Sequence, residues 1–366
     1  MASLDAYPLH GGQLRQISER FGIPVAELLD FSANINPSGP PPSALSALRA
    51  SLDDLTTLTE YPDLEQLDLR QALARYAGTD ARNVIVANGF VPLLEAALRV
   101  LNIRSCLLPV PAFVEYRKAL ERAGVRIVLH KLDSDALFRY DPEAMLAGRE
   151  EAILLANPQN PSGVSHDLAS LRDLATRASK KDMYVLLDEA FIDYVPENSL
   201  VSIVEQFPKL ILFRSVTKFH GIPGLRVAYA IANPALSRSI SENLPPWPIT
   251  TLASRAVIAA LDDHAYVVHS IAENLAQRDA LKGALESYGL RVYPSAANFI
   301  LFQIPLVIDP DLFWRQMIAE HSIVLRSCAN YEGLSKGHFR VAIRTQSENA
   351  RLIEAVSHTL CELQPS

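Results

Sequence analysis

The chain has 366 residues, 49% of them hydrophobic, and a formal net charge of −7 at pH 7. This length and composition suffice for a large apolar core and for two domains. The negative charge disfavours a nucleic-acid or membrane-surface partner. No apolar run approaches the roughly 20 residues that cross a bilayer. The N-terminus has no basic region followed by an apolar stretch, so we expect no secretory signal.

The cysteines bear on location and on metal binding. Cys106, Cys328 and Cys361 are odd in number and include no CxxC pair. This spacing indicates neither a disulfide framework nor a zinc site, so we expect no metal. It fits a reducing cytoplasm.

In chain order, the sequence predicts an N-terminal arm, a large domain and a small domain. The arm covers residues 1–45, has a proline cluster at 37–42, and is expected to return to the mouth of the functional site. The large domain covers residues 46–248. Between about 84 and 232, short apolar runs alternate with amphipathic helical stretches, which is typical of a mainly parallel sheet covered by helices.

The small domain is expected over residues 249–366. The proline-rich stretch 244–250 precedes a long helical pattern at 264–288. Two strand-like runs, a helix, two further strand-like runs and a last helix follow. The predicted fold class is therefore α/β, with a smaller α+β C-terminal domain.

The segment SVTKFHGIPGLR, residues 215–226, carries much of the functional signal. Lys218, at the edge of a buried site, could lose its proton and form a Schiff base with an aldehyde. Ser215, Thr217 and Arg226 could together bind a phosphate group. These features describe a pyridoxal phosphate (PLP) site, although a surface loop with a solvated lysine remains an alternative.

Two further segments follow apolar, strand-like runs. Asp188 follows residues 184–187, at the carboxyl end of a predicted buried strand, where open α/β sheets bind ligands. Its carboxylate could keep the pyridine nitrogen of PLP protonated, or it could simply cap the next segment. Asn160 lies in an Asn-Pro turn after residues 153–156, and the turn could aim its amide at the phenolic oxygen of the ring. Such a turn also commonly does no more than end a strand.

Together, these segments carry a resemblance to a known family. The quoted motifs are HGG at 10–12, DFSANINP at 30–37, VANGF at 86–90, DEAFID at 188–193, TKFHGIPGLR at 217–226, RSCANY at 326–331 and FRVAIR at 339–344. The chain resembles fold-type I PLP enzymes of the class I/II aminotransferase superfamily. Within it, the chain is similar to the histidinol-phosphate aminotransferase branch, and most of all to the L-threonine O-3-phosphate decarboxylases of cobalamin biosynthesis.

The resemblance implies roles for particular residues around PLP. Lys218 would form the Schiff base, Asp188 would pair with the pyridinium nitrogen, and Asn160 would meet the phenolic oxygen. Phe113 would stack on the ring face. The cofactor phosphate would be bound by backbone amides at a helix N-terminus and by side chains, namely Gly89, Phe90, Val91, Ser215, Thr217 and Arg226. Tyr61 would reach the phosphate from the neighbouring subunit, which implies a homodimer.

Two positions depart from the aminotransferase pattern. Phe191 stands where many of those enzymes have a tyrosine that bonds the phenolic oxygen, and the decarboxylase-like relatives also carry phenylalanine there. In the sequence Gly89-Phe90-Val91-Pro92, an acidic or hydroxyl residue would be expected after the glycine. Pro92 is acceptable in a first helical turn, because its missing N–H would have had no intrahelical partner.

Arginines late in the chain bear on the substrate. Arg340 and Arg344 stand four residues apart, so in a strand they would face the same side. By resemblance, Arg340 holds an anionic substrate group, with Asn160 beside it. The remaining pocket residues would be Arg326, His10, Ser32 and Asn34. This set suits a phosphate plus a carboxylate, although Arg344 could instead neutralise a nearby acid.

The resemblance therefore implies a PLP-dependent decarboxylase of O-phospho-L-threonine that forms 1-amino-2-propanol O-2-phosphate. The alternative is a PLP-dependent aminotransferase of histidinol-phosphate type, which would require a 2-oxo acid acceptor. A third hypothesis is a regulatory protein that binds PLP without turnover. The intact set of Lys218, Asp188 and Arg226 argues against it, as does the lack of a basic DNA-binding segment.

Overall fold

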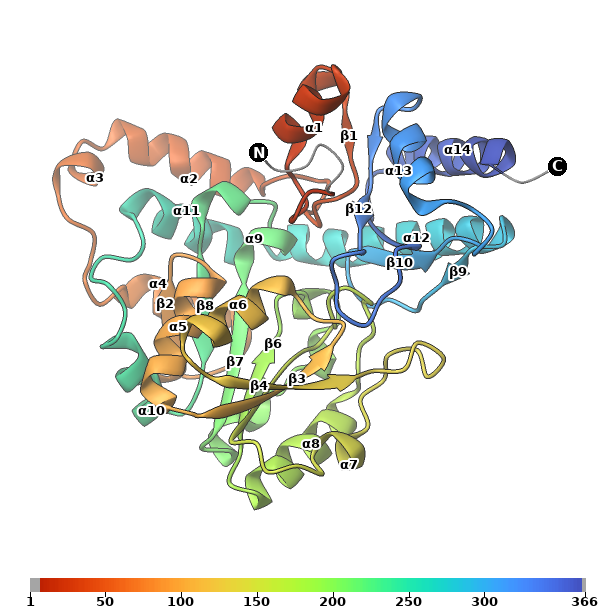
Figure 1. Ribbon diagram of the computed structural model, residues 1–366. Helices are drawn as coiled ribbons and strands as arrows, with labels where there is room; N and C mark the ends of the chain where they lie inside the picture. Colours follow the sequence, from red (N-terminus) through yellow and green to blue (C-terminus); the bar gives the residue numbers. More distant parts are fainter. Residues whose placement is uncertain (1–6, 364–366) are drawn as a thin grey trace.

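The computed structural model describes residues 7–363, so the first six residues of the expected arm lie outside the described residues. Within 7–363, no helix has the length and apolar character needed to span a bilayer. The chain forms a larger part around one central sheet and a smaller part that carries both ends of the described chain (Figure 1).

A seven-stranded sheet forms the middle of the larger part. Its order is β2-β8-β7-β6-β5-β3-β4, and only β8 runs antiparallel to its neighbours. The strands are β2 (Val84–Ala87), β3 (Ser105–Val110), β4 (Arg126–Lys131), β5 (Ala152–Ala156), β6 (Tyr184–Asp188), β7 (Leu210–Ser215) and β8 (Ala228–Ile231). The carboxyl ends of the parallel strands therefore meet at one edge, where such sheets bind ligands. The predicted α/β fold with a mainly parallel sheet is confirmed.

Helices cover both faces of this sheet. Neighbouring strand residues point into opposite cores: Leu107 packs into one and Leu108 into the other. One core includes α4 (Leu67–Ala77), α8 (Leu168–Lys180) and α11 (Thr251–Leu261). The other includes α5 (Phe90–Leu101), α6 (Val114–Arg122) and α10 (Pro234–Ser241). Because both faces are covered, the strands read as continuous apolar runs.

The smaller part contains two further sheets. One has the order β12-β13-β10-β9, and the other pairs β1 with β11 in parallel. These strands are β1 (Leu29–Asp30), β9 (Arg291–Val292), β10 (Phe299–Gln303), β11 (Ile323–Val324), β12 (Arg326–Ser327) and β13 (His338–Ala342). The helices packed around them are α1 (Leu14–Phe21), α12 (His264–Ser287), α13 (Pro310–Ala319) and α14 (Gln346–Leu363). The β1–β11 pairing ties the N-terminal arm to the smaller part.

The remaining helices connect these layers. They are α2 (Pro42–Asp53), α3 (Thr56–Thr59), α7 (Pro142–Met145) and α9 (Val216–Phe219), with 3-10 turns at 25–27, 81–83, 192–194, 196–198, 201–206 and 223–225. The division of the chain at residues 45 and 248 stays a prediction. Although α11 follows the second boundary, it packs against α2 and α4 of the larger part.

Candidate active site

A cavity of about 340 Å³ opens where the carboxyl ends of the parallel strands meet the arm and the smaller part. Most of the expected site residues line it, namely His10, Ser32, Asn34, Phe90, Phe113, Asn160, Asp188, Ser215, Thr217, Lys218, Arg226, Arg326 and Arg340. Gly89, Val91 and Tyr61 are not among the lining residues. Residues more than 300 positions apart thus meet around one cavity.

Asp188 is the last residue of β6, and its carboxylate is buried at the cavity. Its Oδ2 accepts a hydrogen bond from the Tyr116 hydroxyl (2.5 Å), and Oδ1 accepts one from the Ala190 N–H (2.9 Å). Burial raises the pKa of Asp188, while the Tyr116 hydrogen bond and the nearby Lys218 act in the opposite direction. A nearby positive charge stabilises the ionised form of such a buried carboxylate.

Lys218 lies on the short helix α9, directly after β7. Its Nζ donates to Ser215 Oγ (3.2 Å) and lies 5.9 Å from the centre of the Phe191 ring. Burial lowers the pKa of Lys218, and the cationic Arg226 adds to that effect, while Asp188 opposes it. A lower pKa increases the fraction of neutral amine, the form that attacks an aldehyde.

An anion-binding surface lies beside Lys218. The Ser215 and Thr217 hydroxyls are 2.8 Å apart. Arg226 lies against Gly89 so closely that a Cβ at residue 89 would stand 2.9 Å from Nη2. Within residues 7–363, the Arg226 guanidinium has no hydrogen-bond partner. A phosphate would supply the acceptors that such a group of donors lacks.

The start of α5 contributes to the same surface. The Gly89 N–H already donates to Ala87 O (2.8 Å), so this geometry does not support its expected role as an amide donor to phosphate. The N–H groups of Phe90 and Val91 stand in the first turn of α5, where a helix leaves its amides without intrahelical partners. These two amides are the ones placed to bind an anion.

Phe113 and Asn160 complete the part of the cavity where a ring would lie. Phe113 precedes α6 and packs edge-on against Tyr116, with ring centres 5.6 Å apart. Asn160 Oδ1 accepts hydrogen bonds from Arg340 (2.6 Å) and from the Tyr331 hydroxyl (3.4 Å). These contacts fix the orientation of the Asn160 amide. Its NH₂ group then faces away from them and can donate to other acceptors.

Arg326 and Arg340 are direct partners across the β12–β13 ladder. Directly opposite residues project from the same face of a sheet, and both guanidinium groups are buried at the cavity. Arg340 also donates to Ser32 O (3.3 Å), while its buried Nε has no partner among residues 7–363. Burial lowers the pKa of Arg326, and the neighbouring Arg340 adds to this shift. Two cations forced together in this way favour an anionic ligand.

Arg344 does not belong to this pair. The strand β13 ends at Ala342, and Arg344 donates instead to Asp30 O (3.0 Å) and to Glu348 Oε1 (2.7 Å). The expectation that Arg340 and Arg344 face the same side of one strand is therefore wrong. The alternative, that Arg344 neutralises a nearby acid, is confirmed.

The arm residues meet the cavity in different ways. His10 Nε2 lies 3.1 Å from a carboxylate oxygen of Glu115 on α6. Burial lowers the pKa of His10, and Glu115 partly offsets this shift. The Ser32 hydroxyl is engaged by Asp30 Oδ1 (2.5 Å) and by the Gly12 N–H (2.9 Å). The buried Oδ1 of Asn34 has no hydrogen-bond partner among residues 7–363.

Two residues at the site were not singled out from the sequence: Tyr331, which lines the cavity, and Tyr116, which donates a hydrogen bond to the cavity residue Asp188. Tyr116 stands in the first turn of α6, three positions after Phe113 at the N-cap, and this short spacing could have marked it. Tyr331 ends the RSCANY motif, and its ring lies 5.3 Å from the Arg326 guanidinium. Phe191, which was singled out, lines the cavity and packs edge-on against Phe299 at 4.9 Å.

Tyr61 lies apart from the cavity. Its side chain is 81% exposed and stacks on Trp247, with ring centres 4.7 Å apart. Within one chain, Tyr61 is therefore not placed to contact a ligand in the cavity.

Comparisons with known proteins agree on the family. The family model for class I and II aminotransferases matches residues 26–356. A threonine-phosphate decarboxylase of Salmonella typhimurium is 33% identical over 98% of each chain. A histidinol-phosphate aminotransferase of Geobacillus thermodenitrificans is 30% identical over 97% of this chain and 95% of its own. The crystal structure of the Sinorhizobium meliloti histidinol-phosphate aminotransferase with pyridoxal-5'-phosphate has a TM-score of 0.86 and 23% identity, and it covers 100% of this chain and 98% of its own.

Proposed function

This chain belongs to the class I and II aminotransferase family, and from that membership we propose that it is a PLP-dependent carboxy-lyase. Its substrate is O-phospho-L-threonine and its product 1-amino-2-propanol O-2-phosphate, an intermediate of cobalamin biosynthesis. The similarity to the Salmonella decarboxylase over nearly the whole of both chains supports this substrate.

The residues around the cavity fit PLP. Ser215, Thr217, Arg226 and the first amides of α5 would hold its phosphate, and Phe113 would cover one face of its ring. Bound PLP supplies an electron-accepting ring that takes up the electron pair of a bond broken at the substrate Cα. Asp188 would hold the proton on the pyridine nitrogen, and Asn160 would donate to the phenolic oxygen.

The observation that carries the substrate proposal is the buried pair Arg326 and Arg340 at one cavity wall. O-phospho-L-threonine has a phosphate and a carboxylate, which suit two guanidinium groups. Arg340 Nε and Asn34 Oδ1 have no hydrogen-bond partner among residues 7–363, which supports a polar ligand here, whereas both Nη atoms of Arg326 already donate to protein oxygens.

Which bond breaks depends on how the substrate is gripped. The arginine pair would hold the substrate carboxylate and would so select it as the group that leaves as CO₂. Lys218, whose pKa burial lowers, lies beside the same cavity and would return a proton to Cα.

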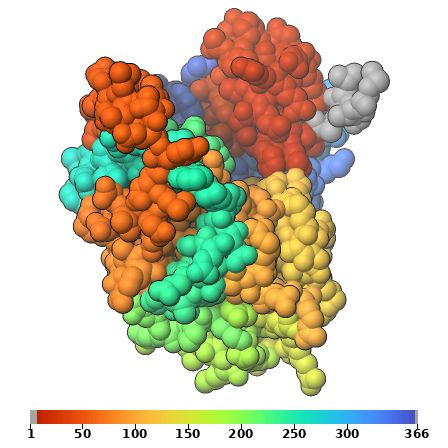
Figure 2. All heavy atoms as spheres, turned by 90° about the vertical axis from the view of Figure 1, so that its left-hand side faces the viewer, coloured from red at the N-terminus to blue at the C-terminus, as the bar shows by residue number. Residues whose placement is uncertain are grey.

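We also propose a homodimer whose sites lie near the subunit interface. One face carries exposed large apolar side chains on and between α2, α3 and α4, with Trp247 beside them. They are Leu45, Leu52, Leu55, Leu58, Tyr61, Leu64, Leu67 and Trp247. Figure 2 shows the orange chain around residues 50–70 beside the teal chain around 245–250 on this face. Apolar groups gathered in this way mark an interaction surface.

Two further parts of the proposal, the cellular location and the division into domains, have physical support. A cytoplasmic location suits Cys106, Cys328 and Cys361, none of which is in a disulfide. The three-part division into arm, large domain and small domain suits a cavity that all three segments line.

The experiment that tests the function uses PLP-loaded protein and O-phospho-L-threonine without any oxo acid. We expect CO₂ and aminopropanol phosphate in equal amounts, because decarboxylation needs no amino acceptor. The Lys218→Ala variant is the control for background decarboxylation. A reaction that releases no CO₂ would refute the proposal.

The aminotransferase alternative has support in the Geobacillus relative. It predicts amino transfer from histidinol phosphate once 2-oxoglutarate is added, without CO₂ from phosphothreonine. Phe191 argues against it, because a phenyl ring beside Lys218 cannot donate a hydrogen bond to the phenolic oxygen.

A further inference from the structure

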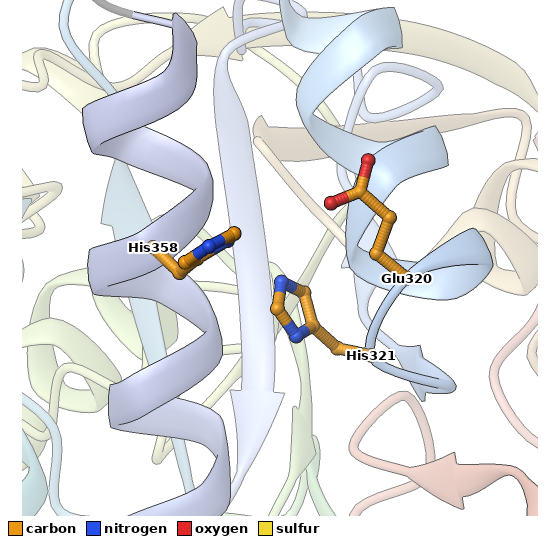
Figure 3. A group of neighbouring side chains, drawn as sticks. All are labelled: Glu320, His321 and His358. Carbon is orange, nitrogen blue, oxygen red and sulfur yellow. The ribbon is translucent and has the colours of Figure 1, made fainter.

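A second group of chemically reactive side chains lies in the smaller part, on elements other than those that line the cavity. Glu320 and His321 follow directly after α13, and His358 stands on α14. Figure 3 shows the three side chains converging from these two elements. One ligand atom from each lies within 4.8 Å of the others.

We infer that Glu320, His321 and His358 bind a divalent transition-metal ion of the Zn²⁺ type. Two imidazoles and one carboxylate are ligands that Zn²⁺ accepts, whereas Mg²⁺ and Ca²⁺ prefer oxygen ligands only. In a tetrahedral site with bonds of about 2.0–2.1 Å, ligand atoms stand about 3.3 Å apart. Glu320 and His358 are exposed, so their side chains have room to rotate toward His321.

The surroundings of the group point to a ligand as well. The Nε2 atom of His321 is buried and has no hydrogen-bond partner among residues 7–363, which is costly for an imidazole nitrogen. The edge-on packing of the His321 and His358 rings, with centres 5.4 Å apart, brings the two rings together without using that nitrogen in a hydrogen bond. A metal ion would supply the missing partner.

Two neighbouring side chains would support such a site. Gln316 Nε2 donates to Glu320 Oε1 (3.2 Å) and to Glu362 Oε2 (3.4 Å), so it holds both carboxylates toward the group. Glu362 Oε1 also lies 3.7 Å from His358 Nε2, so a second carboxylate stands beside the group. Outer hydrogen bonds of this kind commonly orient metal ligands.

The bound ion would join α13 to α14. Because His321 precedes β11, which leads directly to Arg326, the clip would also fix the start of the segment that carries an arginine of the cavity. Metal bound to the folded chain would stabilise it by mass action.

The test is calorimetric titration of untagged, PLP-loaded protein with ZnCl₂, together with thermal unfolding with and without Zn²⁺. We expect one Zn²⁺ per chain at this site and a higher midpoint of unfolding. In His358→Gln, the affinity should fall about 10- to 100-fold and the thermal shift should vanish. His358 is exposed on a helix, so this substitution should leave the fold intact.

His269→Gln is the matched control, since His269 is likewise exposed on a helix, α12, and should leave Zn²⁺ binding unchanged. Cys361→Ser tests the exposed thiol on the same helix. Equal Zn²⁺ affinity in His358→Gln and the parent protein would overturn the inference. Loss of binding in Cys361→Ser alone would overturn it too, because it would assign the ion to the thiol.

Discussion

The hydrogen bond from Tyr116 to Asp188 influences the ionisation of this buried carboxylate. Tyr116 is almost completely buried, so its hydroxyl has little access to water as an alternative partner. Its hydrogen bond to Oδ2 favours the ionised carboxylate against the effect of burial, which raises the pKa of Asp188. The charge that would pair with a pyridinium nitrogen thus depends on a residue of a neighbouring helix.

Replacing Tyr116 with phenylalanine removes this hydrogen bond at nearly constant volume. The pKa of Asp188 should then rise further, and both PLP affinity and turnover should fall. A hydrogen bond to a charged group contributes about 1.5–3 kcal/mol, so we expect a loss of roughly 10- to 100-fold. Dialysis followed by absorbance of the bound cofactor measures the affinity. Tyr293→Phe is the control. It removes a buried tyrosine hydroxyl that contacts His338 away from the cavity, so this variant should bind PLP normally.

Local sequence singled out Lys218, Asp188 and Asn160 as candidates, because each follows an apolar strand within a short motif, and all three line the cavity. It did not identify Tyr116 as a partner of Asp188, since the two residues are 72 positions apart and meet only when α6 covers its face of the sheet. The error on Arg344 has a similar cause. Its orientation depends on where β13 ends, and four-residue spacing alone does not fix that point.

At the scale of elements, the N-terminal arm closes one side of the cavity through a few specific contacts. Arg326 donates to the backbone oxygens of Pro8 (3.0 Å) and Leu9 (2.7 Å), and His10 meets Glu115 on α6. Gly11 packs so tightly that a Cβ there would stand 2.0 Å from Ser32 O. The sequence predicted that the arm returns to the site, but these backbone contacts carry no sequence signal.

Gly11→Ala should therefore displace the arm. The backbone of Ser32 cannot move easily, because Ser32 is bonded to Asp30 and lies beside Arg340. We expect kcat/KM to fall about 10- to 100-fold, since small misplacements of positioning groups have effects of this size. PLP binding should be little changed. Steady-state kinetics measure kcat/KM, and cofactor absorbance measures PLP binding.

Gly283→Ala makes the same chemical change on α12, where a Cβ has nothing within 4 Å, and should keep full activity. If Gly11→Ala also kept its kcat/KM, the arm would not position the substrate.

The surface of the whole molecule carries a patch of exposed apolar side chains that contacts within a single chain do not explain. Among residues 7–363, eight of its seventeen exposed large apolar side chains belong to the segment 45–67 and to Trp247, which stacks on Tyr61. The sequence predicted the α/β core and its mainly parallel sheet, since buried strands and amphipathic helices leave periodic patterns. It gave no comparable pattern for a patch built from α2, α3 and the loop at 244–250, and only the resemblance placed Tyr61 at an interface.

Hybrid dimers test whether Tyr61 acts in the partner's site. Lys218→Ala and Tyr61→Ala chains, each carrying a different affinity tag, would be co-expressed and the hybrid isolated. If Tyr61 serves the neighbouring subunit, one of the two sites keeps both residues, so the hybrid should show about half of the parent activity per dimer, while both homodimers stay impaired. If Tyr61 served its own chain, neither site would be complete and the hybrid would remain as inactive as the homodimers. Sedimentation of each variant shows that dimers persist, which ensures that lost activity reflects the site rather than dissociation.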